Sequence, residues 1–209
     1  MIGDLRIAVP RGALFGETLD LLDTLGVDTA EVRANDRKLL FDSGQLITMR
    51  PSDVPTYVEA GAADIGITGK DVLMEQSERN VYELVDLGFG RCSMVLASVE
   101  GDDAAGEALR RLGVMRVATK YPKTAAAYFE RTGRQAEIVE VKGSVELAPL
   151  TGLVEAIVDL TATGTTLKEN GLVVREEIAL STSRLIANPV AHKLKAEAID
   201  DVVRRLRAG

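Results

Sequence analysis

The sequence contains no tryptophan, a single cysteine and a single histidine, and each scarcity removes a class of chemistry. Cys92 has no second cysteine to pair with, so an internal disulfide is excluded and a reducing compartment fits the chain. Cys92 and His192 are too few to build a zinc site from cysteine and histidine ligands. Acidic residues number 32 against 25 basic ones, and aromatic residues make up only 4%. Such an acidic chain with few stacking rings is a poor candidate for binding nucleic acid.

Long apolar runs are also absent, so neither a membrane-spanning segment nor a signal peptide is expected. The first ten residues already include the charged Asp4 and Arg6. We therefore expect a cytoplasmic protein that does not associate with a membrane. The 209 residues, 46% of them hydrophobic and 27% charged, are enough for one large or two small domains with a packed core.

Strand-like apolar runs alternate with helical patterns along the chain, which favours a mostly parallel α/β fold. Strands are expected at residues 5–9, 45–50, 64–68, 93–97, 115–118, 136–140 and 156–158. Helices are expected at residues 15–25, 51–60, 104–112, 124–132 and 190–206, and residues 173–180 and 184–187 are typical of a return path. Two lobes with the chain crossing twice, or one continuous sheet, both remain open on this pattern.

Residues 156–166 form the most informative candidate site. A short apolar strand leads to Asp159, and a turn of small and hydroxyl residues follows, made of Thr161, Ala162, Thr163, Gly164, Thr165 and Thr166. Backbone N–H groups and hydroxyls at such a turn can bind a phosphate, and Asp159 can accept hydrogen bonds from ribose hydroxyls. The same pattern also describes an ordinary strand-to-helix turn with threonine caps.

Three arginines are candidates for binding anions. Arg11 follows the first expected strand at its carboxyl end, where ligands gather in open α/β sheets. Arg37 and Arg50 are each typical of a solvated surface charge when taken alone. If they converge with Arg11, the three would form a phosphate clamp.

Four further residues have two readings each. Asp64 and Thr68 belong to a glycine-rich run that either presents N–H groups to an anion or makes a tight strand-to-helix turn. Tyr121 precedes Pro122 in a loop and packs either against a nucleotide base or in the core. Glu146 lies near a helix start, where it serves either as part of a capping box or as a ligand-facing group.

The longer stretch of residues 146–167 resembles the signature segment of the ATP phosphoribosyltransferase family. The family pattern is a glutamate, a glycine six residues on, an apolar residue and an aspartate seven residues later, and then Thr-Gly-x-Thr-Leu. The matching residues are Glu146, Gly152, Ile157, Asp159, Thr163, Gly164, Thr166 and Leu167. Val154 replaces a small residue, which affects packing more than chemistry.

Further motifs resemble the same family in the same order, at residues 9–14, 36–39, 50–55, 61–71, 88–92, 118–122 and 183–188. Asp36 stands in the second of them. Arg11 replaces the family's lysine, which keeps the charge but changes the hydrogen-bond geometry. Ala13 replaces an arginine that often contacts the nucleotide in this family.

The resemblance implies the two-lobed architecture of periplasmic binding proteins, with ligands in an inter-lobe cleft. It implies a discontinuous first lobe on the nucleotide side, residues 1–90 and about 171–209, and a second lobe, residues 91–170, that binds phosphoribosyl pyrophosphate. The implied activity is transfer of the 5-phosphoribosyl group from phosphoribosyl pyrophosphate to N1 of ATP, with release of pyrophosphate. This is the first step of histidine biosynthesis.

The same resemblance implies roles for the candidate residues. Asp159 and the loop of residues 161–166 would bind phosphoribosyl pyrophosphate. Arg11, Arg37, Arg50 and Glu146 would be catalytic, and the nucleotide would contact Arg11, Arg50, Asp64, Thr68 and Tyr121. Mg²⁺ would be held by the substrate phosphates, and no metal ligand is expected from the protein.

The chain resembles the short form of the family, which lacks a C-terminal regulatory domain. That form implies a homodimer that assembles with a regulatory subunit resembling histidyl-tRNA synthetase. The amphipathic segment 190–206, with Val190, Leu194, Ala198 and Val202 at helical spacing, fits either a subunit contact or packing on its own lobe.

Two other functions are weighed against this one. A two-lobed ligand sensor without chemistry is disfavoured by the threonine and glycine loop after Asp159, because a sensor needs no cradle for a ribose phosphate. Another phosphoribosyltransferase on a single Rossmann-like domain is disfavoured by the motifs around Arg50 and Asp64.

Overall fold

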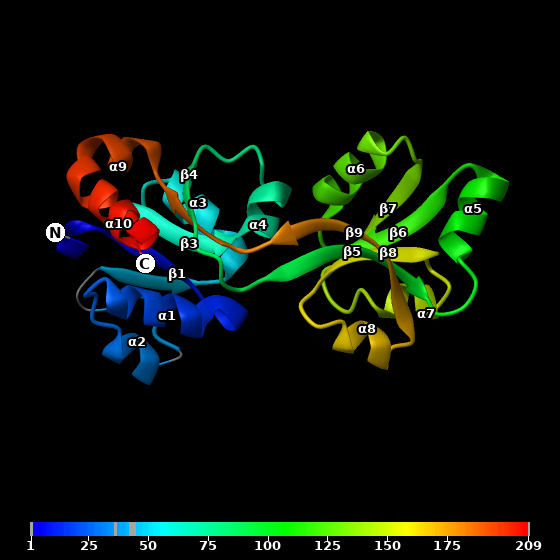
Figure 1. Ribbon diagram of the computed structural model, residues 1–209, viewed down its shortest axis with the longest axis horizontal. Coiled ribbons are helices and arrows are strands. Elements are labelled where there is room, and N and C mark those ends of the chain that lie inside the picture. The colour runs from blue at the N-terminus through cyan, green and yellow to red at the C-terminus, as the bar shows by residue number, and fades with distance from the viewer. Residues whose placement is uncertain (1, 36, 42–44, 209) are drawn as a thin grey trace. The chain divides into compact units, whose positions relative to one another are not determined.

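The computed structural model describes residues 2–35, 37–41 and 45–208, and its chain divides into two compact units. Unit 1 contains residues 1–90 and 182–209, and unit 2 contains residues 91–181. Each unit has its own five-stranded sheet covered by helices (Figure 1). The expected α/β class is therefore confirmed, and the described residues form two separate sheets rather than one continuous sheet.

Unit 1 has a mixed sheet with the strand order β2-β1-β3-β10-β4. Its strands are β1 (Ile7–Pro10), β2 (Leu46–Met49), β3 (Ile65–Gly69), β4 (Tyr82–Asp86) and β10 (Ser183–Ala187). Its helices are α1 (Phe15–Thr24), α2 (Ala30–Ala34), α3 (Val54–Glu59), α4 (Lys70–Glu75), α9 (Pro189–Leu194) and α10 (Ala196–Ala208), with 3-10 turns η1 (Ile2–Asp4), η2 (Gly12–Leu14) and η3 (Pro51–Asp53). Strands β1, β2 and β3 are parallel, so their carboxyl ends share one edge.

The alternation of side chains along β1 explains how helices cover both faces of this sheet. Ile7 and Val9 pack into one apolar cluster with α1 and α10, whereas Ala8 belongs to a second cluster with α3. Gly66 of β3 allows α3 to pack closely, because a Cβ there would lie 2.6 Å from a methyl of Val54. Both faces of the central strands are therefore buried, as a largely parallel sheet requires.

Unit 2 has a mixed sheet with the strand order β7-β6-β8-β5-β9. Its strands are β5 (Cys92–Val99), β6 (Met115–Thr119), β7 (Ala136–Glu140), β8 (Ala156–Thr161) and β9 (Leu172–Ser181). Its helices are α5 (Ala104–Leu112), α6 (Pro122–Arg131), α7 (Leu147–Leu150) and α8 (Thr165–Glu169). Figure 1 shows α5 and α6 over one face of the sheet and α7 and α8 over the other.

The core of unit 2 on the α7 and α8 side is apolar. Ile157 of β8 packs there with Ala148 of α7 and Leu167 of α8, all of them buried. Asp159 lies two residues after Ile157 and therefore points to the same face of the sheet. The burial of these neighbours fixes the position of the carboxylate.

Two boundaries differ from the sequence expectation. Residues 172–181 pair with β5 as the edge strand β9, so the chain returns to unit 1 at Thr182 rather than near residue 171. The expected helix 190–206 is divided into α9 and α10, because Lys195 leaves the helical conformation. The Nζ of Lys195 donates to the backbone oxygen of Asp4 and to the carboxylate of Asp64.

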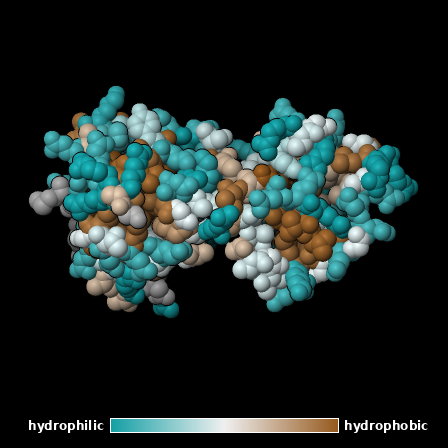
Figure 2. Space-filling model, in the orientation of Figure 1, coloured by the Kyte–Doolittle hydropathy of each residue, from teal (hydrophilic) through white to brown (hydrophobic). Residues whose placement is uncertain are grey.

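Residues 190–206 were expected either to contact another subunit or to pack on their own lobe, and different residues of the segment behave differently. Ala198 and Val202 pack on the core of their own unit. Val190 and Leu194 are exposed, at 63% and 80% of their surface. Charged and polar residues cover much of the face shown in Figure 2. Within the described part of the chain, no helix combines the length and the apolar character needed to cross a bilayer.

Candidate functional site

Unit 2 contains a cavity of about 370 Å³ at the end of its sheet. The lining residues are Lys120, Tyr121, Glu146, Asp159, Leu160, Thr161, Ala162, Thr163, Thr165, Thr166 and Leu167. Strands β6, β7 and β8 run parallel, so the segments that follow them meet at one edge of the sheet. The cavity therefore occupies the carboxyl edge at which open α/β sheets bind ligands.

The candidates at the end of β8 come together in this cavity. Asp159, Thr161, Ala162, Thr163, Thr165 and Thr166 all belong to its wall. Gly164 is not among the lining residues, but it shapes the turn with a φ of +76°. This conformation is strained for any residue with a Cβ, so glycine is the residue that suits the turn.

Asp159 is only 9% exposed. It lies inside β8 rather than just beyond it, because the strand continues to Thr161 and pairs with β5 opposite Val95. Burial raises the pKa of the Asp159 carboxyl above 3.8, against the lowering effect of the N–H of Leu160 and of the Lys120 charge. A carboxylate with a raised pKa on the wall of a cavity is typical of a functional site.

Lys120 is a site residue that the sequence reasoning named only as part of a motif. Its Nζ lies 3.9 Å from Oδ2 of Asp159, and its side chain is 40% exposed. Lys120 directly follows β6, which runs beside β8 in the same direction. The rule that parallel strands share a carboxyl edge is the signal that could have placed it beside Asp159.

The turn itself is held by its own hydroxyls. Thr161 Oγ1 accepts a hydrogen bond of 2.8 Å from the backbone N–H of Gly164. The hydroxyls of Thr163 and Thr165 lie 2.9 Å apart, and Thr163, Thr165 and Thr166 are all exposed. These bonds hold the turn, but the N-cap of α8 is Gly164 and no side chain caps this helix, so the alternative of threonine caps is not what the structure shows; Thr163, Thr165 and Thr166 line the cavity.

Glu146 and Tyr121 approach the cavity from other segments. Glu146 immediately precedes the four-residue helix α7, and its side chain makes no capping hydrogen bond there. Its negative charge contributes to the raised pKa of Asp159. Tyr121 precedes α6, and its backbone N–H donates to Thr119 Oγ1 over 2.9 Å. Glu146 is therefore placed as a cavity residue rather than as a cap.

Unit 1 contains a larger cavity of about 700 Å³ that extends along its sheet, from Arg6 and Ala62 before β1 and β3 to Arg11 and Arg50 after β1 and β2. The lining residues are Arg6, Arg11, Leu39, Leu40, Ile47, Thr48, Met49, Arg50, Asp53, Tyr57 and Ala62. Arg11 follows β1 and Arg50 follows β2, so the structure brings these two candidates together. The apolar walls and the basic groups suit a ligand with a flat ring and a negative charge.

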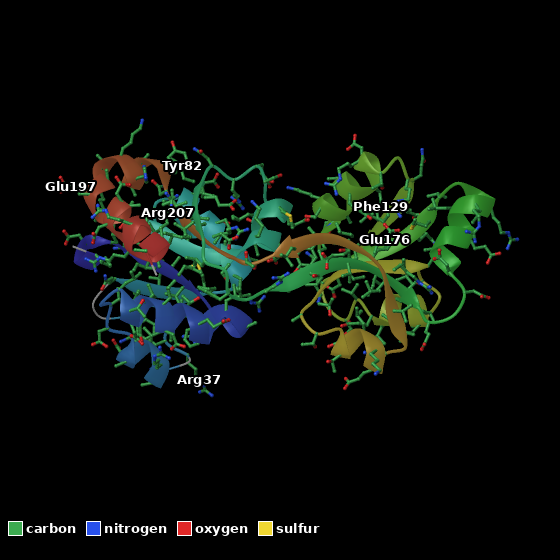
Figure 3. The ribbon with its side chains drawn as sticks, viewed as in Figure 1. Arg37, Tyr82, Phe129, Glu176, Glu197 and Arg207 are labelled. Atoms are coloured by element: carbon green, nitrogen blue, oxygen red, sulfur yellow. The ribbon has the colours of Figure 1, made fainter. Side chains whose placement is uncertain are left out.

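Arg11 and Arg37 do not match the expected clamp of three similar cations. The guanidinium of Arg11 donates to Thr48 Oγ1 and to the backbone oxygens of Lys38 and Asn35. Arg37 is exposed and does not line the cavity, and Figure 3 shows its side chain pointing away from the ribbon of unit 1. Asp36, in the same motif, lies outside the described residues.

The two remaining nucleotide candidates of unit 1, Asp64 and Thr68, are not among the residues that line this cavity. Asp64 precedes β3 and so lies at the opposite edge of the sheet from Arg11 and Arg50. Its carboxylate accepts from the N–H of Arg6 and from Lys195 Nζ, both over 2.7 Å. Thr68 is fully buried, and its hydroxyl donates to the backbone oxygen of Pro51. Both side chains therefore have partners within unit 1, and the assignment of Asp64 and Thr68 to nucleotide binding stays a prediction.

Comparison with known proteins decides the family. A family model described as HisG, ATP phosphoribosyltransferase, matches residues 50–208. The chain belongs to the ATP phosphoribosyltransferase family. It is 57% identical over 194 residues to the ATP phosphoribosyltransferase of Rubrobacter xylanophilus, covering 91% of this chain and 89% of that one. It is 49% identical over 207 residues to the Geobacillus enzyme of the same name, covering 97% of both chains.

Solved structures agree with this membership. An ATP phosphoribosyl transferase (HisG:HisZ) complex from Thermotoga maritima contains a chain with 34% identity and a TM-score of 0.80, covering 98% of this chain and 97% of that one. The periplasmic aliphatic sulphonate binding protein SsuA from Escherichia coli has a TM-score of 0.62 over 97% of this chain and 70% of that chain. Its 14% identity shows a shared fold alone, which confirms the periplasmic-binding-protein-like architecture.

As an ATP phosphoribosyltransferase, the protein transfers the 5-phosphoribosyl group of phosphoribosyl pyrophosphate to N1 of ATP and releases pyrophosphate. This reaction is the first step of histidine biosynthesis. Enzymes of the family use a metal ion. Among the described residues, no group of three or more histidine, cysteine, aspartate or glutamate side chains is arranged to hold one.

Proposed function

We propose that the cavity of unit 2 binds phosphoribosyl pyrophosphate. Asp159 accepts hydrogen bonds from the ribose hydroxyls, and the hydroxyls and backbone N–H groups of residues 161–166 bind the 5-phosphate. One observation supports this assignment above the others. A buried carboxylate and a loop of exposed threonine hydroxyls line the same small cavity, with the Lys120 ammonium group close by. A phosphorylated sugar presents matching groups, since its diol donates hydrogen bonds and its phosphate carries negative charge.

The reaction needs alignment and charge stabilisation more than proton transfer. The lone pair of adenine N1 forms a bond to the anomeric carbon, while the bond from that carbon to the pyrophosphate oxygen breaks. Positive charge develops on the ribosyl group, and pyrophosphate departs with the bonding electron pair. In this proposal Asp159 holds the sugar while N1 approaches, and cationic groups stabilise the leaving pyrophosphate.

We assign the cationic role to Arg37 and Arg50 of unit 1. Both side chains are exposed, and no partner is found for either guanidinium among the described residues. A solvated guanidinium can turn toward a polyphosphate and form a bidentate contact. Arg50 also lines the apolar cavity of unit 1, which we assign to the nucleotide. Tyr121 lines the cavity of unit 2, and we keep it as a candidate for contact with the nucleotide.

We propose Mg²⁺ as the metal ion of the reaction. Magnesium usually binds one or two carboxylates and several phosphate oxygens, and it rarely needs a complete cage of protein ligands. The diphosphate oxygens of the substrate would hold the ion, beside the cavity that Asp159 and Glu146 line. When bound, Mg²⁺ would neutralise charge on the pyrophosphate. Asp159 and Glu146 would meanwhile orient the ribose.

We further propose that the protein forms a homodimer and assembles with a HisZ-like regulatory subunit. The solved Thermotoga maritima structure is a HisG:HisZ complex, and this chain covers 97% of the matching chain in it. We also assign the protein to the cytoplasm, because a chain with a single cysteine fits a reducing compartment.

A single assay tests these assignments together. The protein is mixed with Mg²⁺, ATP and phosphoribosyl pyrophosphate, with and without a HisZ-like subunit, and pyrophosphate release and adduct absorbance are followed. We expect both signals to appear together and to stop when the metal is chelated. Activity that is unchanged by chelation would contradict the role of magnesium. Full activity without any HisZ-like subunit, and no association with one by light scattering, would contradict the assembly.

A further inference from the structure

Arg11 is tied to the segment that carries Arg37. Its Nη2 donates to the backbone oxygen of Lys38 over 2.7 Å and to that of Asn35 over 3.4 Å. These two acceptors lie on either side of Arg37 in the sequence, 24 and 27 residues away from Arg11. The guanidinium therefore holds both flanks of the short turn from which Arg37 projects.

The turn is also held from within. The side-chain oxygen of Asn35 accepts hydrogen bonds from the backbone N–H groups of Arg37 and Lys38, over 3.1 Å and 3.0 Å. An asparagine that bonds to its own backbone two residues on makes a local turn of this kind. Arg11 adds a further connection to the sheet of unit 1, beside the bonds that Thr48 donates from its hydroxyl to Lys38 O over 3.3 Å and from its N–H to Leu39 O over 2.8 Å.

The guanidinium of Arg11 is itself fixed. Its Nε donates to Oγ1 of Thr48 over 3.0 Å, and Thr48 is only 2% exposed on β2. The group also stacks over the ring of Phe15, 5.2 Å from its centre. A planar guanidinium can bond to three acceptors in fixed directions, whereas the ammonium of a lysine is a point charge without a fork. Arginine is therefore well suited to this connection.

We propose that Arg11 is a positioning residue that sets the orientation of Arg37, and that most of its effect on the reaction passes through Arg37. This inference rests on the proposed role of Arg37 in stabilising the leaving pyrophosphate. The hydrogen bonds of Arg11 go to the protein backbone and to Thr48, while the guanidinium of Arg37 is exposed. A misplacement of about 1 Å at a reacting group lowers turnover by roughly 100-fold, so support of this kind is measurable.

A double-mutant cycle tests the proposal on the whole enzyme with its regulatory subunit. We expect R11A to lower kcat by roughly 10- to 100-fold, with a smaller change in the KM values. In the R37A background, R11A should change kcat by less than about 3-fold, because the arginine that Arg11 positions is no longer present. If R11A lowers kcat by the same factor in both backgrounds, Arg11 acts on its own and the proposal is overturned. R204A, which removes an exposed arginine of α10 in the same unit, is the matched control and should combine independently with R37A.

Limited digestion with trypsin gives a second readout that does not depend on turnover. The scissile bonds follow Arg37 and Lys38, inside the turn that Arg11 holds. We expect R11A to be cut there several-fold faster than the wild type, and R204A to be cut at the wild-type rate. An unchanged rate in R11A would show that the turn needs no support from Arg11. If R37A leaves turnover unchanged, the proposed role of Arg37 fails, yet the digestion still measures the connection.

T48V covers the case in which R11A does not fold. This variant keeps Arg11 and removes the hydroxyl that accepts from its Nε and that itself donates to the backbone oxygen of Lys38 over 3.3 Å. We expect a smaller change of the same kind, with faster cleavage after Lys38 and a kcat lowered by about 3- to 10-fold. Wild-type values for both measurements in folded T48V would contradict the proposal.

Discussion

Lys120 Nζ lies 3.9 Å from Oδ2 of Asp159, and this separation is longer than a hydrogen bond. The ammonium group therefore lowers the pKa of Asp159 less than a direct contact would. Burial remains the larger influence, so the pKa of the carboxyl stays above its ordinary value. A carboxylate held in this way lacks a strong partner inside the protein and is ready to accept hydrogen bonds from a ligand.

The first prediction concerns the ribose assignment. D159N keeps the shape of the side chain and removes its charge, so the ribose hydroxyls lose a charged acceptor. Hydrogen bonds to charged groups contribute about 1.5–3 kcal/mol each, so KM for phosphoribosyl pyrophosphate should rise by roughly 10- to 100-fold. Steady-state kinetics at saturating ATP measure this change. E169Q alters an exposed carboxylate on α8 outside the cavity and should keep the wild-type KM; a wild-type KM for D159N would refute the assignment.

The raised pKa of Asp159 predicts how stability depends on pH. Above pH 3.8 the folded protein keeps a proton on this carboxyl that the unfolded chain has already lost. The contribution of Asp159 to the free energy of unfolding therefore decreases as pH rises from 3.8 through the raised pKa, and it is constant above that range. Thermal unfolding of wild type and D159N across this range isolates the effect, because the other groups are common to both.

We expect D159N to gain stability relative to the wild type as pH rises through this window, and to be the more stable protein at neutral pH. Replacing a buried charge with a neutral amide removes its desolvation cost. If the free energy of unfolding of the wild type instead rose relative to that of D159N as pH increases, Asp159 would be stabilised in its charged form. The interpretation of a carboxylate without a strong partner would then be wrong.

Gly164 gives a prediction that separates backbone strain from ligand binding. Its φ of +76° makes alanine unfavourable there, although nothing within 4 Å would clash with a Cβ. G164A should lose about 1 kcal/mol of stability and raise KM for phosphoribosyl pyrophosphate, because the turn beside the phosphate deforms. G171A is the matched control, since Gly171 has a φ of +64° after α8 and lies outside the cavity lining. G171A should lose similar stability and keep its KM for phosphoribosyl pyrophosphate. Equal KM values for G164A and G171A would argue against binding of the 5-phosphate by residues 161–166.

Arg37 gives a prediction about turnover. R37A should lower kcat by about 100-fold and leave the dissociation constant of ATP within a few-fold of wild type, because the charge acts on the leaving pyrophosphate. Pre-steady-state kinetics and nucleotide titration separate the two effects. R204A, an exposed arginine of the same unit, should change neither quantity. A pure loss of nucleotide affinity in R37A would assign Arg37 to ground-state binding instead.

The sequence alone predicted those parts of the candidate site that depend on neighbouring residues along the chain. Asp159 lies in β8 and the loop follows that strand directly, so strand periodicity and turn chemistry were enough to place them together. The extra length of β8 could not be seen, because its last residues pair with β5, which is more than sixty residues earlier. Register of this kind depends on contacts that a local pattern does not contain.

Contacts between distant segments explain the other differences. Asp64 has the pattern of a residue before a glycine-rich strand, but its partner Lys195 is 131 residues away in sequence. Arg11 resembles a cation without a partner in the sequence, and only the structure reveals that the backbone oxygens of Asn35 and Lys38 accept its hydrogen bonds. Lys120 was within reach of prediction, because the direction of β6 places it beside the end of β8.

The binding of phosphoribosyl pyrophosphate to unit 2 is tested most directly by hydrogen exchange on the wild-type protein. Backbone amides are compared with and without phosphoribosyl pyrophosphate and Mg²⁺, in the absence of ATP. We expect slower exchange at residues 161–167, where N–H groups and hydroxyls meet the 5-phosphate, and little change at the amides of α10. Unchanged exchange at residues 161–167 under saturating ligand would contradict the account.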